Sequence, residues 1–370
     1  MSDSPAKVHE VNPDLIRCLA LFFVLSIHFY THCGIYDAAY TGVSAFLTVL
    51  LRTLVTTSVA LFVMLTGYLQ RTKKLSARYY LGILRLLEMY LICAVTELLY
   101  RHFYLGEAMT VRSFLGAIVN FTASEYSWYI LLYAGLFMMI PFLNLAYGSL
   151  SCRGHKRLLV VSFFLLSALP FSALNVFVNL CAYWWQRIWP LTFYFAGAYI
   201  GEYRPRISAK KCALWLCAAL LVFSAFNFFV YSPASPLKLH YEQAFPYTHE
   251  GLQNAILAPL VFLFILNIDC SRWSEKLAGF AASVSKYIYG AFLFSSMTDS
   301  FVYIWLNRFV PVPEKRFAFF LIALPVSYAA SVLLAMLADK LVNVMDRALR
   351  PAAARLTGWL YRLIAPDAAE

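Results

Sequence analysis

Stretches of roughly twenty apolar residues recur along the whole 370-residue chain, separated by short polar segments. A helix of that length crosses the hydrocarbon core of a bilayer. Only 13% of the residues are charged, which is too few to cover the surface of a water-soluble protein of this size. The pattern predicts an all-α polytopic membrane protein of about ten transmembrane helices. The predicted segments are 14–34, 45–69, 78–100, 126–146, 157–174, 188–202, 212–231, 252–269, 285–306 and 317–341.

Lysine and arginine residues cluster between the apolar segments. If the amino terminus is cytoplasmic, 20 of them fall on the cytoplasmic side and 8 on the outer side. This bias follows the positive-inside rule, so we expect both termini in the cytoplasm and a multi-pass protein of the inner membrane. The net charge of +11 is spread over loops and not gathered on one face, so membrane lipids are the expected partner and nucleic acid is not.

The chain shows no boundary between domains, and residues 1–370 are expected to form one transmembrane domain. The last stretch, about 346–370, is basic and aromatic, and we expect it to lie as an amphipathic tail on the inner leaflet. No spacing of histidine and cysteine typical of a metal site occurs, so no metal site is predicted.

Two ionisable residues stand out in the first apolar segment, Arg17 and His28. Eleven residues correspond to about three helical turns plus 20°, so the two side chains share a face and lie about 16 Å apart along the axis. One interpretation is structural: Arg17 reaches the inner headgroups and His28 bonds a neighbouring helix. The other is chemical, with His28 as a general base and Arg17 as the binding group for an anionic ligand.

Further charged residues lie in the third and ninth segments. Arg85 and Glu88 are one turn apart and either neutralise each other or, with Arg78, form a basic wall for a polyanion from the cytoplasm. Ser295 and Asp299 share one helix face, where a hydrogen bond within or between helices is the expected role.

The second segment contains the block SVALFVMLTGYL, residues 58–69, in which small and polar residues favour close helix packing. Together with the first segment, this block resembles the acyltransferase-3 family of integral membrane acyltransferases. Asp14, Arg17 and His28 match the family's first-helix signature of an acidic residue, an arginine and a histidine eleven positions later. Ser58, Gly67 and Tyr68 match its second-helix block.

The resemblance covers essentially the whole chain and is nearest to the single-domain, common-antigen O-acetyltransferase-like branch. Arg78 and Arg85 correspond to the basic start of the family's third helix. Trp128 matches a family tryptophan, but the histidine usual before it is absent, and Ser295 stands where the family has a late histidine.

This resemblance implies a membrane O-acyltransferase of the bacterial inner membrane, in the first place an O-acetyltransferase. Cytoplasmic acetyl-CoA or another acyl-CoA would be the donor substrate, with no permanently bound cofactor. The acceptor would be a hydroxyl of a cell-surface glycan or lipid-linked saccharide. His28 and Arg17 are then the expected catalytic residues, and Arg17, Arg78 and Arg85 would bind CoA. The residues expected to support substrate or structure are Asp14, Ser58, Gly67, Tyr68, Trp128 and Ser295.

Two other functions remain compatible with the sequence. A transporter or flippase of a glycan intermediate would have the same architecture, although no internal repeat is evident. A sensor or scaffold with a decayed site is the third possibility.

Overall fold

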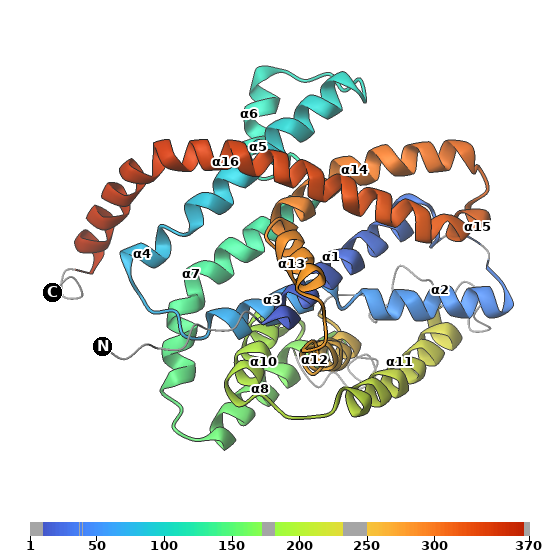
Figure 1. Cartoon of the computed structure of the whole chain (residues 1–370), viewed down its shortest axis with the longest axis horizontal. Helices are drawn as coiled ribbons and strands as arrows, with labels where there is room; N and C mark the ends of the chain where they lie inside the picture. The colour runs from blue at the N-terminus through green and yellow to red at the C-terminus, as the bar shows by residue number, and fades with distance from the viewer. Residues whose placement is uncertain (1–9, 37, 39, 172–181, 232–249, 366–370) are drawn as a thin grey trace.

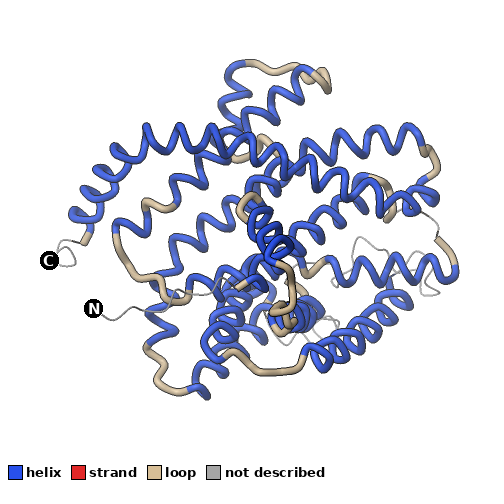
Figure 2. The backbone as a smooth tube through the Cα atoms, viewed as in Figure 1, coloured by secondary structure: helices blue, strands red, loops and turns tan. Residues whose placement is uncertain are grey.

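The structure is a computed structural model that describes residues 10–36, 38, 40–171, 182–231 and 250–365. Within these ranges all regular secondary structure is helical, as Figure 2 shows. The first half of the chain forms α1 (Val11–His32), α2 (Gly42–Val55), α3 (Ser58–Gln70), α4 (Ala77–Tyr80), α5 (Ile83–Phe103), α6 (Val111–Val119), η1 (Glu125–Ser127), α7 (Trp128–Gly148), α8 (Arg153–Ala168) and η2 (Leu169–Phe171). The second half forms η3 (Tyr183–Ile188), α10 (Trp189–Tyr203), α11 (Ala209–Tyr231), α12 (Leu252–Leu266), α13 (Glu275–Ser285), α14 (Ile288–Phe309), α15 (Pro313–Arg316), η6 (Phe317–Phe319) and α16 (Phe320–Ile364).

Each of the ten predicted apolar segments lies on one helix or on two consecutive helices, apart from residues 172–174, which lie outside the described residues. Among the described residues, five helical segments are long and apolar enough to cross a membrane. The number rises to six if α13 and α14, bent by 66° at their junction, form one span. The all-helical membrane fold is therefore confirmed, whereas ten crossings and cytoplasmic termini stay predictions. Fewer than ten helices meet the requirements for a span because α10 and α12 have only 15 residues each and α5 carries several charges.

The second predicted segment is divided into two helices. The hydroxyls of Thr56 and Thr57 donate to the carbonyls of Thr53 and Leu54, so they compete with the helical hydrogen bonds at the break. The buried Arg52 lies on the first part, with its guanidinium 4.0 Å from the centre of the Tyr36 ring.

Helix α1 lies at the centre of the bundle and packs against α3, α12, α13, α14 and α16 (Figure 1). Beside it, α3 and α10 cross at very short range. A Cβ atom on Gly67 would lie 2.0 Å from the Tyr194 carbonyl oxygen, and one on Gly197 would lie 1.9 Å from that of Met64. Only glycine fits at these two positions, so the small residues of the 58–69 block serve helix packing.

Helix α16 runs along α14 and α5 and continues past the rest of the bundle (Figure 1). Its 45 residues include most of the segment predicted as the last span, 317–341, whose first three residues form η6, and most of the predicted tail. The end of that tail, 366–370, lies outside the described residues.

Candidate active site

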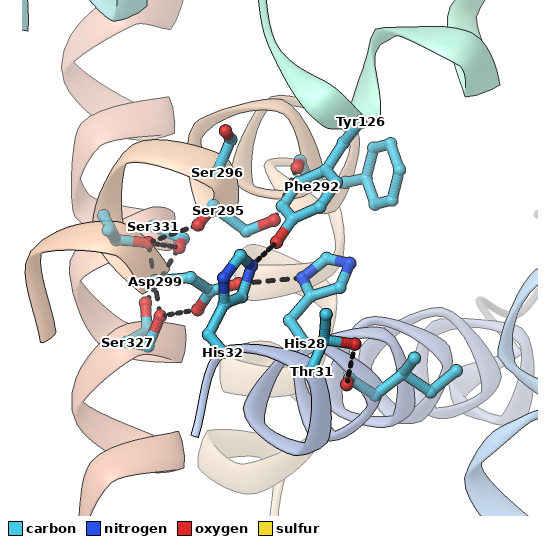
Figure 3. Close-up of polar contacts among 12 residues, drawn as sticks. His28, Thr31, His32, Tyr126, Phe292, Ser295, Ser296, Asp299, Ser327 and Ser331 are labelled. Carbon is cyan, nitrogen blue, oxygen red and sulfur yellow. Dashed lines mark hydrogen bonds and ion pairs between the residues drawn. The ribbon is translucent and has the colours of Figure 1, made fainter. Parts of the chain in front are cut away.

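The side chain of His28 points from α1 toward α14, where it meets Asp299 (Figure 3). Its Nδ1 lies 2.7 Å from the Asp299 Oδ2, and the Asp299 side chain is fully buried. A carboxylate accepts, so Nδ1 carries the proton and donates it to Asp299. In the neutral imidazole with this tautomer, the other ring nitrogen, Nε2, has a free lone pair, which is the form that a general base requires.

Asp299 is itself held in place by hydroxyl groups. Ser327 of α16 donates its hydroxyl to Oδ1 of Asp299 (Figure 3). Behind it, the Thr298 hydroxyl lies 3.2 Å from that of Ser327 and 2.6 Å from that of Ser331. This buried network fixes the carboxylate, and through it the orientation of the His28 ring.

Tyr126, in η1, covers one face of the His28 ring. The two rings stack with centroids 3.7 Å apart at an angle of 11°. The Tyr126 hydroxyl is 2.8 Å from Nε2 of His32, one turn beyond His28 on α1 (Figure 3). Tyr126 is therefore held by two neighbouring histidines, through a stack and a hydrogen bond.

Arg17 lies on the side of α1 that faces α13 and α14, as does His28, in agreement with the predicted shared face. Its Nη1 donates to Asp14 at 3.2 Å and to Ser285 at 3.0 Å. The Ser285 hydroxyl also donates to Asp14, so the carboxylate orients both partners. About 29% of the Arg17 side chain stays exposed, so it retains donors for a ligand.

Arg17 lines an inner cavity of about 200 Å³. The other walls come from α3, α5, α7 and α14 and are aromatic and aliphatic in about equal part, with Phe62, Tyr129, Tyr133 and Phe292 among the aromatic residues. The cavity is small, and Arg17 is the only charged residue among those that line it.

A second cavity of about 760 Å³ is lined by His32 of α1. We call it the outer cavity and the first one the inner cavity, because His32 is nearer than Arg17 to the carboxyl end of α1. Polar and charged residues outnumber apolar ones in its lining, which includes Glu97, Asn307 and the half-exposed ring of Trp128. At its rim the Arg101 guanidinium bonds Glu107 at 2.6 Å and lowers the pKa of that carboxyl below its usual range. Such a lining of amides, carboxylates and an indole suits a polyhydroxylated ligand.

The remaining predicted site residues have partners other than His28. Arg78 is exposed on α4. Arg85 donates to Asp339 at 2.5 Å and Asn343 at 3.0 Å of α16, and not to Glu88. It therefore joins α5 to α16, and the predicted neutralisation by Glu88 is wrong because the partners come from another helix.

The second-helix residues and the late serine have structural surroundings. Ser58 is fully buried at the start of α3, and Gly67 forms the crossing with α10. The Tyr68 hydroxyl donates to Glu10 at 3.2 Å. Ser295 donates to the carbonyl of Phe292 in its own helix.

Three residues of the site were given no chemical role by the sequence: Asp299, Ser327 and Tyr126. Asp299 carried a signal, because a carboxylate within an apolar helix needs a partner. The sequence predicted a hydrogen bond of Asp299 within or between helices, but it could not show that the partner of Asp299 is His28, 271 residues away.

A model of the acyltransferase-3 family, described as an acyltransferase domain, matches residues 10–336. The match includes α1 with Arg17 and His28, α14 with Asp299, and the Ser327 position of α16. No curated protein and no solved structure shows a significant match to the chain. Since the family model covers most of the 370 residues, the chain belongs to the acyltransferase-3 family and is a membrane acyltransferase.

Proposed function

We propose that this acyltransferase moves an acyl group, in the first place acetyl, from cytoplasmic acyl-CoA to a hydroxyl of a cell-surface glycan or lipid-linked saccharide at the bacterial inner membrane. The observation that carries the proposal is the buried pair of His28 and Asp299. It leaves an unprotonated ring nitrogen in the bundle interior, and such a base can activate a hydroxyl without a metal ion.

The inner cavity supports an acyl-CoA donor. Its aromatic walls fit the slender pantetheine arm of CoA, and Arg17 can form charge-assisted hydrogen bonds to a phosphate. The separation of about 16 Å along α1 between Arg17 and His28 suits a donor whose thioester lies at the end of a long arm. Arg78 is exposed and free to bind further phosphate, whereas Arg85 would first have to release Asp339.

The outer cavity supports a saccharide acceptor. Glu97 and Asn307 supply hydrogen-bonding groups, and the indole of Trp128 supplies a flat apolar surface for a sugar ring. His32, which also lines this cavity, is one turn from His28, so an acceptor there is close to the base.

The reaction follows from these positions. Nε2 of His28 takes the proton of the acceptor hydroxyl, and the oxygen forms a bond to the thioester carbonyl carbon. The carbon–sulfur bond breaks, and the leaving thiolate takes the proton from Nε2. The products are an ester and free CoA thiol, and His28 returns to its starting form. Asp299 stabilises the imidazolium that exists between the two proton transfers.

The experiment is acyl transfer by the purified protein reconstituted in vesicles, with acetyl-CoA on the Arg17 side and envelope polysaccharide or lipid-linked saccharide on the other. We expect acceptor acetyl esters by mass spectrometry and an equal amount of free CoA thiol. Movement of the saccharide across the bilayer with no ester and no thiol would instead identify a flippase.

A further inference from the structure

The inner and outer cavities lie at different levels along α1, and His28 stands between these levels. Along α1 the order is Arg17 at the inner cavity, His28, and then His32 at the outer cavity. Along α5 the inner cavity is lined by Leu86 and the outer one by Glu97, eleven residues later. The two helices agree on the same arrangement, with His28 at the level between the cavities.

The barrier at this level is aromatic. Tyr126 stacks on His28, and its ring centroid is 6.3 Å from that of Phe292, which lines the inner cavity (Figure 3). Tyr126 is only 7% exposed. One turn beyond Phe292 on α14, Ser296 already lines the outer cavity. The partition between the polar outer cavity and the apolar inner one is thus a layer of aromatic side chains.

Such a layer matters because water is a competing acceptor. If a water molecule from the outer cavity took the place of the acceptor hydroxyl, the same base would release a carboxylic acid and CoA thiol, and the acyl group would be lost. Exclusion of water from a reactive acyl group prevents this side reaction.

We infer that Tyr126 is a positioning residue that separates outer-cavity water from the thioester, so that acyl transfer prevails over hydrolysis. The inference rests on the proposed function. The Tyr126 hydroxyl bonds His32 and so holds the tyrosine ring over His28. An acceptor in the outer cavity would have to displace this ring to reach Nε2 of His28.

The test compares thiol release from acetyl-CoA without acceptor, which reports hydrolysis, with ester formation when acceptor is present. For Tyr126→Ala in reconstituted full-length protein we expect the ratio of hydrolysis to transfer to rise at least about tenfold. Tyr126→Phe keeps the stack and loses the bond to His32, so a smaller rise is expected. If Tyr126→Ala does not fold, Tyr126→Leu also removes the aromatic stack and the hydroxyl and gives the same readout.

Tyr79→Ala is the matched control. Tyr79 also stacks on an aromatic ring, Phe137, at 4.4 Å and 9°, and its hydroxyl also donates a hydrogen bond, but both partners belong to α7 and not to the histidines of α1. An unchanged ratio in Tyr126→Ala and Tyr126→Leu, with normal transfer by the wild type, would overturn this inference alone. No transfer by the wild type would overturn the proposed function.

A separate surface feature is the distal part of α16. The helix has 45 residues and so extends over about 67 Å, more than twice the roughly 30 Å of a hydrocarbon core. Its end therefore lies outside the core or along the membrane surface. Figure 1 shows that this end bends away from the bundle, and Pro351 lies within the helix in that part.

The distal part of α16 is strongly amphipathic. At 100° per residue, its four arginines fall within an arc of about 140° and its large apolar side chains within the opposite arc. The arginines are Arg347, Arg350, Arg355 and Arg362, and the apolar side chains are Leu349, Leu356, Trp359, Leu360, Leu363 and Ile364. All six apolar side chains are exposed, so among the described residues no protein surface covers them.

We propose that this helix lies in the membrane surface and binds anionic phospholipid headgroups through its arginine face. Asp346 pairs with Arg350 at 2.7 Å, which leaves Arg347, Arg355 and Arg362 without a carboxylate partner among the described residues. In this orientation the apolar face of the helix is buried among the acyl chains, and its arginine face contacts the lipid phosphates.

The test uses full-length protein with its native cysteines replaced and one cysteine carrying an environment-sensitive dye. Leu360→Cys places the dye on the apolar face, and Gly358→Cys, on the arginine side, is the control. In phosphatidylcholine vesicles containing phosphatidylglycerol we expect the dye at 360 to be protected severalfold from an aqueous quencher relative to 358. Arg355→Gln with Arg362→Gln should reduce that protection. Equal quenching at both positions, or protection independent of phosphatidylglycerol, would contradict the proposal, as would disulfide cross-linking of two copies through position 360.

Discussion

Replacement of Asp299 by asparagine tests the imidazole orientation without changing the size of the side chain. In the wild type both carboxylate oxygens accept, one from Ser327 and the other from His28. An amide that keeps the Ser327 bond turns its NH2 group toward Nδ1 of His28. Nδ1 must then be an acceptor, so the proton moves to Nε2 and the lone pair needed for catalysis is lost.

The size of the effect follows from the role of the base. General-base catalysis contributes about 10² to 10⁴ in rate, and loss of the correct tautomer in a serine–histidine–aspartate site costs about 10⁴. We therefore expect the turnover number to fall by roughly two to four decades, about 3–5 kcal/mol at 1.36 kcal/mol per decade. Because the inner cavity lies at the other end of α1, the KM for acyl-CoA should change little.

The assay is acetyl ester formation by reconstituted protein at saturating acetyl-CoA, with thiol release measured in parallel. Asp299→Ala removes the acceptor altogether and should give a similar loss. Ser295→Ala, one turn earlier on the same buried face and bonded only to its own helix, is the matched control. Turnover of Asp299→Asn and Asp299→Ala near that of the control would refute the assignment of His28 as a carboxylate-oriented base.

Three further predictions concern other parts of the structure. Gly67→Ala places a Cβ 2.0 Å from the Tyr194 carbonyl, so α3 and α10 must separate, and we expect a loss of about 3 kcal/mol or more in thermal or denaturant unfolding. An unfolding curve like the wild type would contradict the observed crossing. Arg17→Gln removes a charged donor from the inner cavity and should raise the KM for acyl-CoA about tenfold or more, with a smaller effect on the KM for the saccharide. Trp128→Ala should do the reverse, raising the saccharide KM about tenfold and leaving that of acyl-CoA unchanged. Steady-state kinetics with each substrate varied in turn distinguishes the two variants, and equal effects on both KM values would contradict separate cavities.

Much of the fold follows from local sequence. Apolar length and helical periodicity place helices at all ten predicted segments, and the spacing of Arg17 and His28 correctly gives their common face. The breaks between helices were harder to predict from the sequence. The division at Thr56 depends on which threonine hydroxyls turn back to the chain, and a hydropathy count does not register this.

The site was predicted only in part, because its pairs join distant parts of the chain. Arg85 has a carboxylate one turn away on its own helix, yet it pairs with Asp339, 254 residues later. Asp299 likewise finds His28 only after α1 and α14 have packed together. Sequence spacing identifies neighbours within one helix, whereas the packing of the bundle determines which helices face each other. The pair of His28 and Asp299 depends on that packing.

We propose that Nε2 of His28 is the base that activates the acceptor hydroxyl. Single-turnover acetyl transfer by His28→Ala, measured together with binding of CoA to the same folded, reconstituted protein, tests this role. We predict that ester formation is abolished while CoA binding stays within a few fold of the wild type, because Arg17 and the inner cavity are untouched. Ester formation at the wild-type rate in His28→Ala would show that His28 is not the base.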